Sequence, residues 1–293
     1  MKYVTLSDLS ITIRRNFYKI PHDIDFIVTI PRSGTIVGSI ISEFLNCPMI
    51  DIYSFIDGAK PNGGGRLRYF KEQEHENGKK KVLVVDDTVF TGKSKKEARE
   101  QLKPFEDTHD FIFLVAYLEG PAVDTVDIYL EDVRYATNGY KDPVIYEWNI
   151  FHHNESTMET CMYDIDGVLC IDPPDERNGE EYIEYIKNAI PLFTPTAKIG
   201  ALVTYRLVKN EEITKKWLSD HGIRYGKLIM FNAQTWDERN AKGISPELMK
   251  GEYYKSQEWA KLFVESDDYQ AQIIHKISGK PVYCVASNRM YAN

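Results

Sequence analysis

Two adjacent carboxylates, Asp86 and Asp87, stand directly after the aliphatic run 82–85. The turn that follows them, residues 88–94, is rich in hydroxyl groups and contains Gly92, where a ligand can approach the backbone closely. Carboxylates at the end of a buried strand can accept hydrogen bonds from vicinal sugar hydroxyls, and backbone N–H groups in such a turn can wrap a phosphate monoester. These residue types in this order predict a site for a ribose phosphate.

The alternative is an ordinary acidic turn followed by a helix cap, since Thr, Ser and Asp favour both positions. The aliphatic strand before the acids and the basic helix-like stretch after them favour the ligand site. The block resembles the ribose-phosphate loop of the type I phosphoribosyltransferases. The resemblance implies that Asp86 and Asp87 hold the 2- and 3-hydroxyls of phosphoribosyl pyrophosphate (PRPP), and that the 5-phosphate is bound by the loop residues Thr88, Val89, Phe90, Thr91, Gly92, Lys93 and Ser94.

About fifty residues upstream, the run 26–30 leads into a short turn formed by Arg32, Ser33 and Gly34. This stretch resembles the pyrophosphate loop of the same family, in which a helix N-terminus faces the anion. The family's mobile catalytic loop would carry Arg66 and Arg68, which could neutralise charge on the departing pyrophosphate. A solvated Gly-rich arm is the alternative for these two arginines.

A second pair of carboxylates, Asp164 and Asp166, lies one residue apart after the apolar run 161–163 and before a glycine. Two carboxylates so placed point the same way from the end of a strand, where one can attack a phosphoryl group while the other transfers protons. A calcium-type turn or a simple loop is the alternative for so short a pattern.

The pattern resembles motif I of the haloacid dehalogenase (HAD) phosphatases. The resemblance implies that Asp164 is the nucleophile and a Mg²⁺ ligand, and that Asp166 is the general acid and base and belongs to the same metal site. Thr204 matches the motif II hydroxyl, and Lys255 matches the motif III ammonium, with Lys250 as the competing candidate. The motif IV acids are Glu265 and Asp267, and the sequence leaves open which one completes the metal shell; the short segments between motifs predict no large cap domain.

Short β-rich runs must position both acid pairs. In the first half the runs 26–30, 49–55, 82–85 and 111–118 alternate with helix-like stretches, which is typical of β-α-β units that build a parallel sheet. The pattern restarts after residue 154 with runs at 161–165, 199–204, 227–231, 262–266 and 281–286. We therefore expect an α/β protein with two Rossmann-like domains in tandem, 1–154 of phosphoribosyltransferase type and 155–293 of HAD type with a minimal cap. The Gly-rich stretch 60–81 is expected to be a surface loop or a loose hairpin arm.

Composition limits the partners. The chain has 293 residues, 43% of them hydrophobic and 27% charged, and a formal net charge of -8. This is typical of a globular protein and disfavours nucleic acid as a partner, although small phosphorylated ligands remain compatible. The four cysteines form no C-x-x-C pair, and no apolar run is long enough for a signal peptide or a membrane span. A cytoplasmic location with reduced thiols is the expectation.

Joining the two activities would yield an unphosphorylated ribofuranoside, because the second domain could remove the phosphate that the first leaves on the acceptor. The pairing resembles bacterial PRPP-dependent ribofuranosyltransferases of surface-glycan synthesis, which implies a glycan hydroxyl as acceptor, inversion to a β-linkage, Mg²⁺ in each domain and association with other glycan-assembly enzymes. A hydroxyl acceptor needs a base, for which Asp87, His152 and His153 are candidates, with Trp148 as a sugar platform.

Two other functions stay open. The acceptor could be a nucleobase, with the second domain trimming nucleotides. Alternatively, the first domain could sense PRPP without consuming it and regulate the phosphatase. The stretch that contains Trp148, His152 and His153 could also be a segment that closes a domain without any chemistry.

Overall fold

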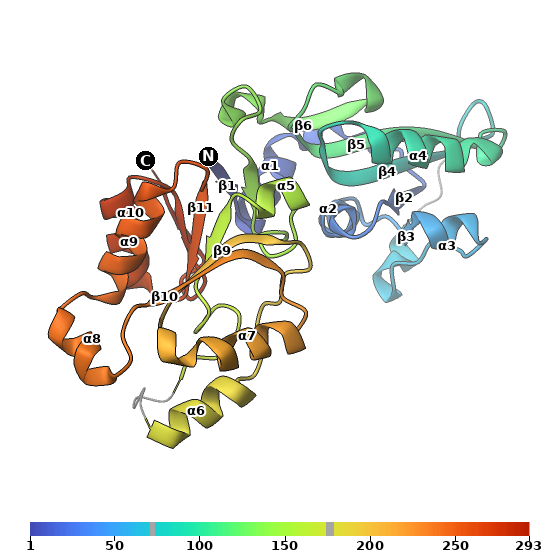
Figure 1. Cartoon of the computed structure of the whole chain (residues 1–293). Coiled ribbons are helices and arrows are strands. Elements are labelled where there is room, and N and C mark those ends of the chain that lie inside the picture. The colour runs from blue at the N-terminus through green and yellow to red at the C-terminus, as the bar shows by residue number, and fades with distance from the viewer. Residues whose placement is uncertain (71–73, 174–178, 293) are drawn as a thin grey trace. The chain divides into compact units, whose positions relative to one another are not determined.

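The chain forms two compact units, Met1–Trp148 (unit 1) and Asn149–Asn293 (unit 2). The computed structural model describes residues 1–70, 74–173 and 179–292 (Figure 1). The sequence-based boundary at residue 154 lies a few residues beyond the division between the units. Each unit is built on its own mainly parallel sheet, so the protein is of the α/β class with two such sheets.

Unit 1 is centred on a five-stranded parallel sheet with the strand order β3-β2-β4-β5-β6. Its strands are β2 (Phe26–Thr29), β3 (Met49–Asp51), β4 (Lys80–Val89), β5 (His109–Leu118) and β6 (Ile128–Asp132). Its helices are α1 (Leu6–Arg15), α2 (Ser33–Leu45), α3 (Ile52–Ile56) and α4 (Lys93–Leu102).

Alternation of side chains along β4 produces two hydrophobic layers in unit 1. Leu83 and Val85 face a core that includes Leu9 and Ile13 of α1 and residues of α2. Val82 and Val84 point the opposite way and pack with residues of α3 and α4. Because successive strand residues face opposite sides, a continuous aliphatic run is the pattern of a strand covered on both faces, and the strand in the middle of this sheet has it.

A separate two-stranded parallel sheet joins β1 (Lys2–Val4) to β7 (Val144–Tyr146). The connection continues past the strands, since the Glu147 backbone N–H donates to Val4 O at 2.9 Å. The Glu147 carboxylate also accepts the backbone N–H of Leu6 at 2.8 Å, at the start of α1. The N-terminal segment therefore fixes the path of the chain at residue 147.

Unit 2 contains a six-stranded sheet with the order β10-β9-β8-β11-β12-β13, parallel except for the pair β12 and β13. The strands are β8 (Cys161–Tyr163), β9 (Ile199–Leu207), β10 (Tyr225–Phe231), β11 (Leu262–Glu265), β12 (Val282–Cys284) and β13 (Arg289–Tyr291). The helices are α5 (Glu155–Met158), α6 (Gly179–Asn188), α7 (Glu211–Asp220), α8 (Trp236–Lys242), α9 (Pro246–Ser256) and α10 (Asp268–Ser278).

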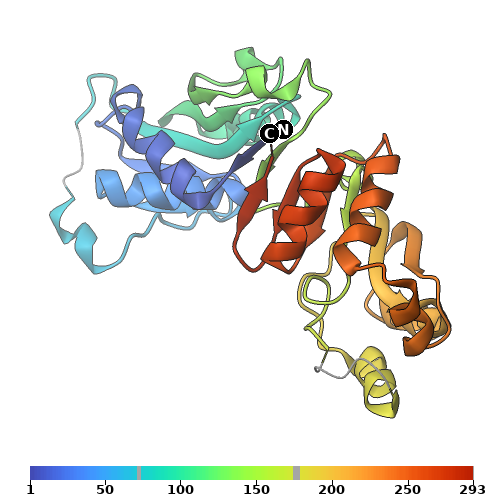
Figure 2. The same cartoon turned by 90° about the vertical axis from the view of Figure 1, so that its left-hand side faces the viewer.

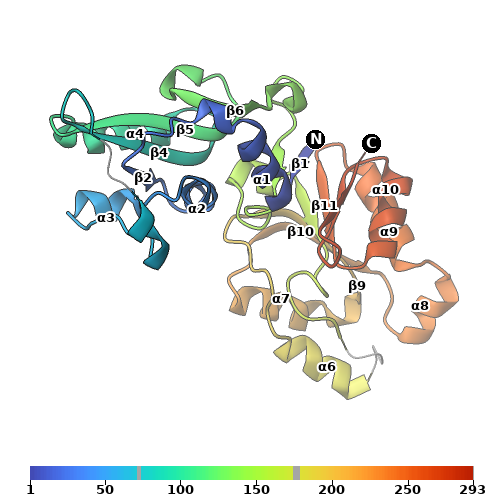
Figure 3. The ribbon, with the colours of Figure 1, turned by 180° about the vertical axis from the view of Figure 1, so that it is seen from behind.

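Helices α9 and α10 lie side by side against the sheet of unit 2 (Figure 2), where Tyr254, Ala271 and Ile274 pack on Met162 and Phe263 of the strands. Helices α6 and α7 lie together away from that pair (Figure 3). The connection from β8 to β9, residues 164–198, contains α6. Among the described residues of this connection, which exclude 174–178, α6 is the only helix.

Three expectations about elements need correction. The run 49–55 is a strand only to Asp51, because the Asp51 carboxylate accepts the N–H groups of Tyr53 and Ser54 and caps α3. Strand β4 does not stop before the acids but continues through them to Val89. The segment 60–81 contains the 3₁₀ helix Gly65–Tyr69 and the start of β4, while residues 71–73 lie outside the described part.

All four cysteines are unpaired and buried. Burial raises the pKa of Cys47 and Cys161 to about 12, so these thiols stay protonated and behave as small apolar groups. Among the helices of the described residues, none combines the length and apolarity that crossing a bilayer requires.

Candidate active sites

Strand β4 is longer than its neighbour β2, and this difference creates the first site. β2 pairs with β4 only as far as Val85, whereas β5 continues alongside β4 to Val89. Asp86 and Asp87 therefore lie on the part of β4 that β2 does not cover. They line a pocket of about 340 Å³ together with the turn that follows β2. The remaining lining residues are Pro31, Arg32, Ser33, Thr88, Val89, Phe90, Thr91, Gly92, Ser94 and Lys95.

Asp86 is buried and fully engaged by protein donors. One carboxylate oxygen accepts the Asp87 backbone N–H at 2.9 Å, and the other accepts from the Lys95 ammonium. Lys95 is itself 3% exposed and also donates to the Thr88 carbonyl, so it connects Asp86 to the loop. Burial raises the pKa of Asp86 to about 7, with Lys95 opposing the rise and the charge of Asp87 adding to it.

Asp87 has a different partner, because one of its oxygens accepts the indole N–H of Trp148 at 2.8 Å. Trp148 follows β7 and packs against Tyr146 with ring centroids 5.0 Å apart. Glu119, directly after β5, is also close, and its carboxylate accepts a hydrogen bond from the Val144 backbone. Burial raises the pKa of Glu119 to about 7, and the charge of Asp87 adds to that rise.

The turn after β2 brings the N-terminus of α2 to the same pocket. Gly34 is required at this position, since a Cβ there would lie 2.6 Å from Val85 O and 2.9 Å from Asp86 Cα. The close approach places Arg32 and Ser33 beside the acids. A helix N-terminus and an arginine form an arrangement that favours an anionic group.

Four residues predicted for this site do not line the pocket: Gly34, which packs against β4, and Arg66, Arg68 and Lys93. Arg66 is exposed and its guanidinium is 3.8 Å from the Glu43 carboxylate. Neither Arg66 nor Arg68 is among the lining residues, and both belong to the 3₁₀ helix Gly65–Tyr69. Lys93 is exposed on the first turn of α4, 3.8 Å from Glu97. The contact of the arginine loop with pyrophosphate stays a prediction.

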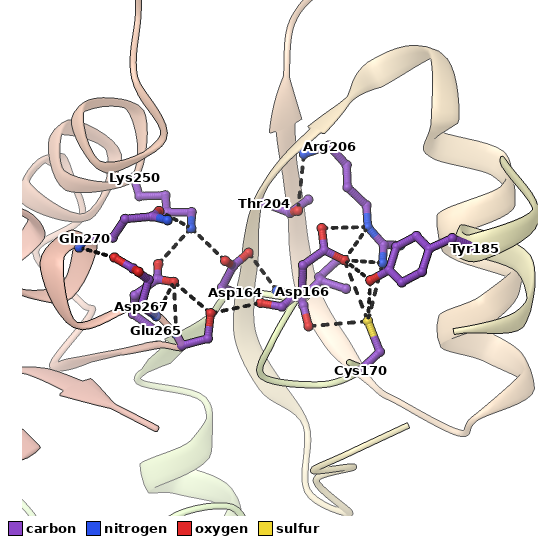
Figure 4. Close-up of polar contacts among 12 residues, drawn as sticks. Asp164, Asp166, Cys170, Tyr185, Thr204, Arg206, Lys250, Glu265, Asp267 and Gln270 are labelled. Carbon is purple, nitrogen blue, oxygen red and sulfur yellow. Dashed lines mark hydrogen bonds and ion pairs between the residues drawn. The ribbon is translucent and has the colours of Figure 1, made fainter. Parts of the chain in front are cut away.

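The second site is organised by a buried lysine. Lys250 Nζ lies 2.6 Å from Asp164 Oδ2, 2.7 Å from Glu265 Oε2 and 3.0 Å from the Gln270 side chain (Figure 4). Asp164, Glu265 and Lys250 are all buried. Burial raises the pKa of Asp164, and Lys250 opposes the rise while Glu265 adds to it. Burial by itself would lower the pKa of Lys250, but the two carboxylates raise it, so the lysine stays charged.

The structure corrects the position of the expected ammonium group. Lys255 is exposed near the end of α9, whereas Lys250 reaches the carboxylates from the same helix. Five residues separate the two lysines, which places them about 140° apart around a helix of 3.6 residues per turn. Thr204, the predicted motif II hydroxyl, is fully buried and accepts the Arg206 backbone N–H at 3.3 Å.

Asp166 is held on the opposite side by groups that sequence analysis did not single out. The buried guanidinium of Arg206 donates to its carboxylate, with the shortest contact 2.5 Å, and the Tyr185 hydroxyl of α6 lies 2.7 Å from it (Figure 4). The Cys170 thiol is 3.7 Å away. Two planar N–H donors on one carboxylate fix its orientation.

A pocket of about 450 Å³ opens between these groups, and carboxylates dominate its lining. Five aspartates contribute to it, together with the single cation Lys250 among the lining residues. The aspartates are Asp164, Asp166, Asp172, Asp267 and Asp268. These carboxylates repel a phosphate dianion, and carboxylate oxygens are the kind of ligand that Mg²⁺ prefers.

Three of the four predicted metal ligands, Asp164, Asp166 and Asp267, line the pocket, and Glu265 does not. Among residues 1–70, 74–173 and 179–292, no group of three or more His, Cys, Asp or Glu side chains is arranged to hold a metal ion. Glu265 is committed to Lys250 and does not line the pocket, whereas Asp267 does. Asp267 also caps α10 through the Gln270 backbone N–H at 2.8 Å. Asp164 and Asp267 both line the pocket, and their ligation of a cation stays a prediction.

The two candidate bases after Trp148 belong to unit 2. His152 is exposed, and the His153 ring accepts the backbone N–H of Asn154 at 2.9 Å beside the N-terminus of α5. Lys95, Glu119, Arg206 and Tyr185 were missed by sequence analysis. Lys95 could have been found, because it lies on the face of α4 occupied by Ala98 and Leu102, where a lysine needs a buried partner.

Comparison with known proteins identifies a family for the segment that carries the first pocket. Residues 5–128 match the phosphoribosyl transferase domain family. Similar solved structures include a Helicobacter pylori xanthine-guanine-hypoxanthine phosphoribosyltransferase, at 16% identity over 51% of this chain and 93% of that one, with a TM-score of 0.35. A purine phosphoribosyltransferase from Pyrococcus horikoshii has 21% identity over 50% and 94% of the two chains, with a TM-score of 0.34.

An orotate phosphoribosyltransferase from Aeropyrum pernix has 15% identity over 46% of this chain and 75% of that one, with a TM-score of 0.32. At these TM-scores and identities, similarity to a solved structure does not establish a shared acceptor. The match to the family covers the strand, the acid pair and the loop that line the first pocket. Residues 5–128 of the chain therefore constitute a phosphoribosyltransferase domain.

Proposed function

We propose that the chain is a bifunctional ribofuranosyltransferase. Unit 1 transfers the 5-phosphoribosyl group of PRPP to an acceptor hydroxyl, and unit 2 then removes the 5-phosphate. The observation that carries the proposal is the first pocket, in which two acids and a hydroxyl-rich turn meet at the end of β4 within a phosphoribosyltransferase domain.

In unit 1 the acid pair would bind the ribose hydroxyls, and residues 88–94 would bind the 5-phosphate. Arg32 and the N-terminus of α2 would face the pyrophosphate, which leaves C1 as the acceptor oxygen bonds to it. The acceptor hydroxyl gives up its proton to a base, for which the Asp87 carboxylate of the pocket is the candidate, and inversion at C1 gives a β-ribofuranoside. Mg²⁺ bound to the pyrophosphate would offset the charge of the leaving group.

In unit 2 the Asp164 carboxylate would attack phosphorus, and the ribose 5-oxygen would depart and take up a proton. Water would then cleave the aspartyl phosphate and release inorganic phosphate. Lys250 keeps Asp164 oriented and charge-balanced, while Arg206 and Tyr185 hold Asp166 in place as the proton-transfer group. Mg²⁺ at Asp164 and Asp267 would supply the positive charge that the phosphate requires.

A glycan hydroxyl is the proposed acceptor because a phosphatase in the same chain would destroy the product of nucleotide salvage. The test is mass spectrometry of the full-length protein with PRPP, Mg²⁺ and a panel of glycan and nucleobase acceptors. We expect a gain of unphosphorylated ribose with the wild type and of 5-phosphoribose with Asp164→Asn.

Other outcomes separate the alternatives. A dephosphorylated product from Asp164→Asn would reject the proposed roles of the two units. Transfer to a nucleobase alone would assign the chain to nucleotide chemistry. If PRPP binds but is not consumed in the presence of any acceptor, unit 1 would be a PRPP sensor. Loss of pyrophosphate release in the double variant Asp86→Ala, Asp87→Ala would support the first site, and retained release would reject it.

A further inference from the structure

The two acids of the first pocket have unequal surroundings. The charge of Asp86 is matched by the Lys95 ammonium, and each of its oxygens accepts from the protein. Asp87 is 7% exposed and accepts a neutral donor, the indole N–H of Trp148, at 2.8 Å. A carboxylate can rotate about its Cβ–Cγ bond, so a donor fixed on one oxygen determines where the other oxygen points.

Trp148 is itself rigidly held. Its ring packs against the first hydrophobic core and against Tyr146. The preceding residue, Glu147, is tied to Val4 through its backbone and to Leu6 through its side chain. A donor with so little freedom can define the position of the carboxylate that it contacts.

We propose that Trp148 is a positioning residue of the PRPP site, which aims Asp87 at the ribose hydroxyls. The inference rests on the proposed function of unit 1, because it presupposes that PRPP occupies this pocket. Trp148 then acts through Asp87 and need not contact the ligand. This role differs from that of a sugar platform, because the indole N–H makes the functional contact and the face of the ring does not.

The decisive variant is Trp148→Phe, which keeps an aromatic ring and removes the N–H. A hydrogen bond to a charged group contributes to the binding free energy when it positions that group for the ligand. Its loss should therefore raise the dissociation constant for Mg²⁺–PRPP by about tenfold. Tyr146→Phe is the matched control: it keeps the neighbouring ring and removes only a hydroxyl, which is buried and has no hydrogen-bond partner among the described residues. That control should bind PRPP like the wild type.

Calorimetric titration of the full-length proteins with PRPP and Mg²⁺ measures these constants, and hydrolysis of p-nitrophenyl phosphate by unit 2 should be unchanged in both variants. A structural role alone would lower the melting temperature of ligand-free Trp148→Phe without a selective loss of PRPP affinity. Wild-type affinity in Trp148→Phe would overturn the inference and leave the proposed function intact. No binding of PRPP by the wild type would overturn both.

A second measurement does not depend on the variant folding. Trp148 is the one tryptophan among residues 1–148, and the other three, Trp217, Trp236 and Trp259, follow it. Closure of a ribose diol on Asp87 changes the environment of the indole N–H, so PRPP should shift the emission of the wild type. Pyrophosphate alone, which has no ribose, should not produce this shift. Equal responses to the two ligands, or none to PRPP, would contradict the inference.

Discussion

Lys250 of α9 lies 2.6 Å from Asp164 of the neighbouring strand end, and the same ammonium is 2.7 Å from Glu265. We expect Lys250→Met to abolish phosphate release by unit 2 and to lower the free energy of unfolding by about 3–5 kcal/mol, because two buried carboxylates lose their cation. Lys255→Met, on the exposed side of the same helix, should change stability by less than about 0.5 kcal/mol. Urea denaturation and p-nitrophenyl phosphate hydrolysis check both; equal effects would contradict the assignment.

The Asp166–Arg206 pair allows a similar test. Arg206→Met leaves a buried carboxylate without its cation and should destabilise unit 2 by about 3–5 kcal/mol. Arg224→Met is the control, since Arg224 is exposed and lies 3.8 Å from Glu155, a pair that should contribute at most about 1 kcal/mol. Chemical denaturation monitored by circular dichroism measures both values. A small loss for Arg206→Met would mean that the pair is not buried in solution.

Glu119 should make the stability of unit 1 depend on pH. Its pKa is raised from 4.5 to about 7 in the folded chain, so the folded state binds a proton more tightly than the unfolded state between these values. The stabilisation is present below pH 4.5 and is lost as pH rises through 7. Between these two pH values the free energy of unfolding of the wild type should fall by about 3 kcal/mol relative to that of Glu119→Gln.

The measurement for Glu119 is urea denaturation at several pH values. The exposed residue Asp107 provides the control, because Asp107→Asn should leave the pH dependence of the wild type unchanged. Parallel curves for wild type and Glu119→Gln would show that this carboxylate is not buried as the structure has it.

Gly34 should not tolerate a methyl group. In Gly34→Ala the new Cβ would press on the backbone of Val85 and Asp86, so α2 or β4 must move and the acid pair with it. We expect a loss of about 1–3 kcal/mol in stability and weaker PRPP binding. Gly65→Ala meets nothing within 4 Å and should preserve stability. Normal PRPP affinity in Gly34→Ala would show that the turn after β2 does not contribute to the pocket.

The sequence predicts the central strands well because a buried parallel strand leaves a continuous aliphatic run, as at 82–85. The short strands β1, β7 and β13 are not predicted, since three residues have no measurable periodicity, whereas β3, β8 and β12, equally short, lie within longer apolar runs. The run 49–55 was misread because the same aliphatic residues fit a capped helix, and only the Asp51 side chain decides between them.

The candidate sites show the same division. Asp86, Asp87 and their loop could be located because they are contiguous in the chain. Arg206 could not, because it reaches Asp166 from 40 residues away, and the hydrogen bond of Trp148 to Asp87, 61 residues distant, could not be predicted although Trp148 itself was a candidate. Lys250 and Lys255 both fit the sequence pattern, since spacing to Glu265 does not reveal which side of α9 faces the sheet.

Trp148 is the final residue of unit 1, and Asn149 begins unit 2. A gene shortened to express the transferase half by itself would therefore have to retain the codon for residue 148. Removal of that one codon would leave the sheet, both acids and the phosphate loop in the product and still deprive Asp87 of its hydrogen-bond donor. Such a fragment would bind its donor substrate poorly, a defect that could be mistaken for dependence on the missing half.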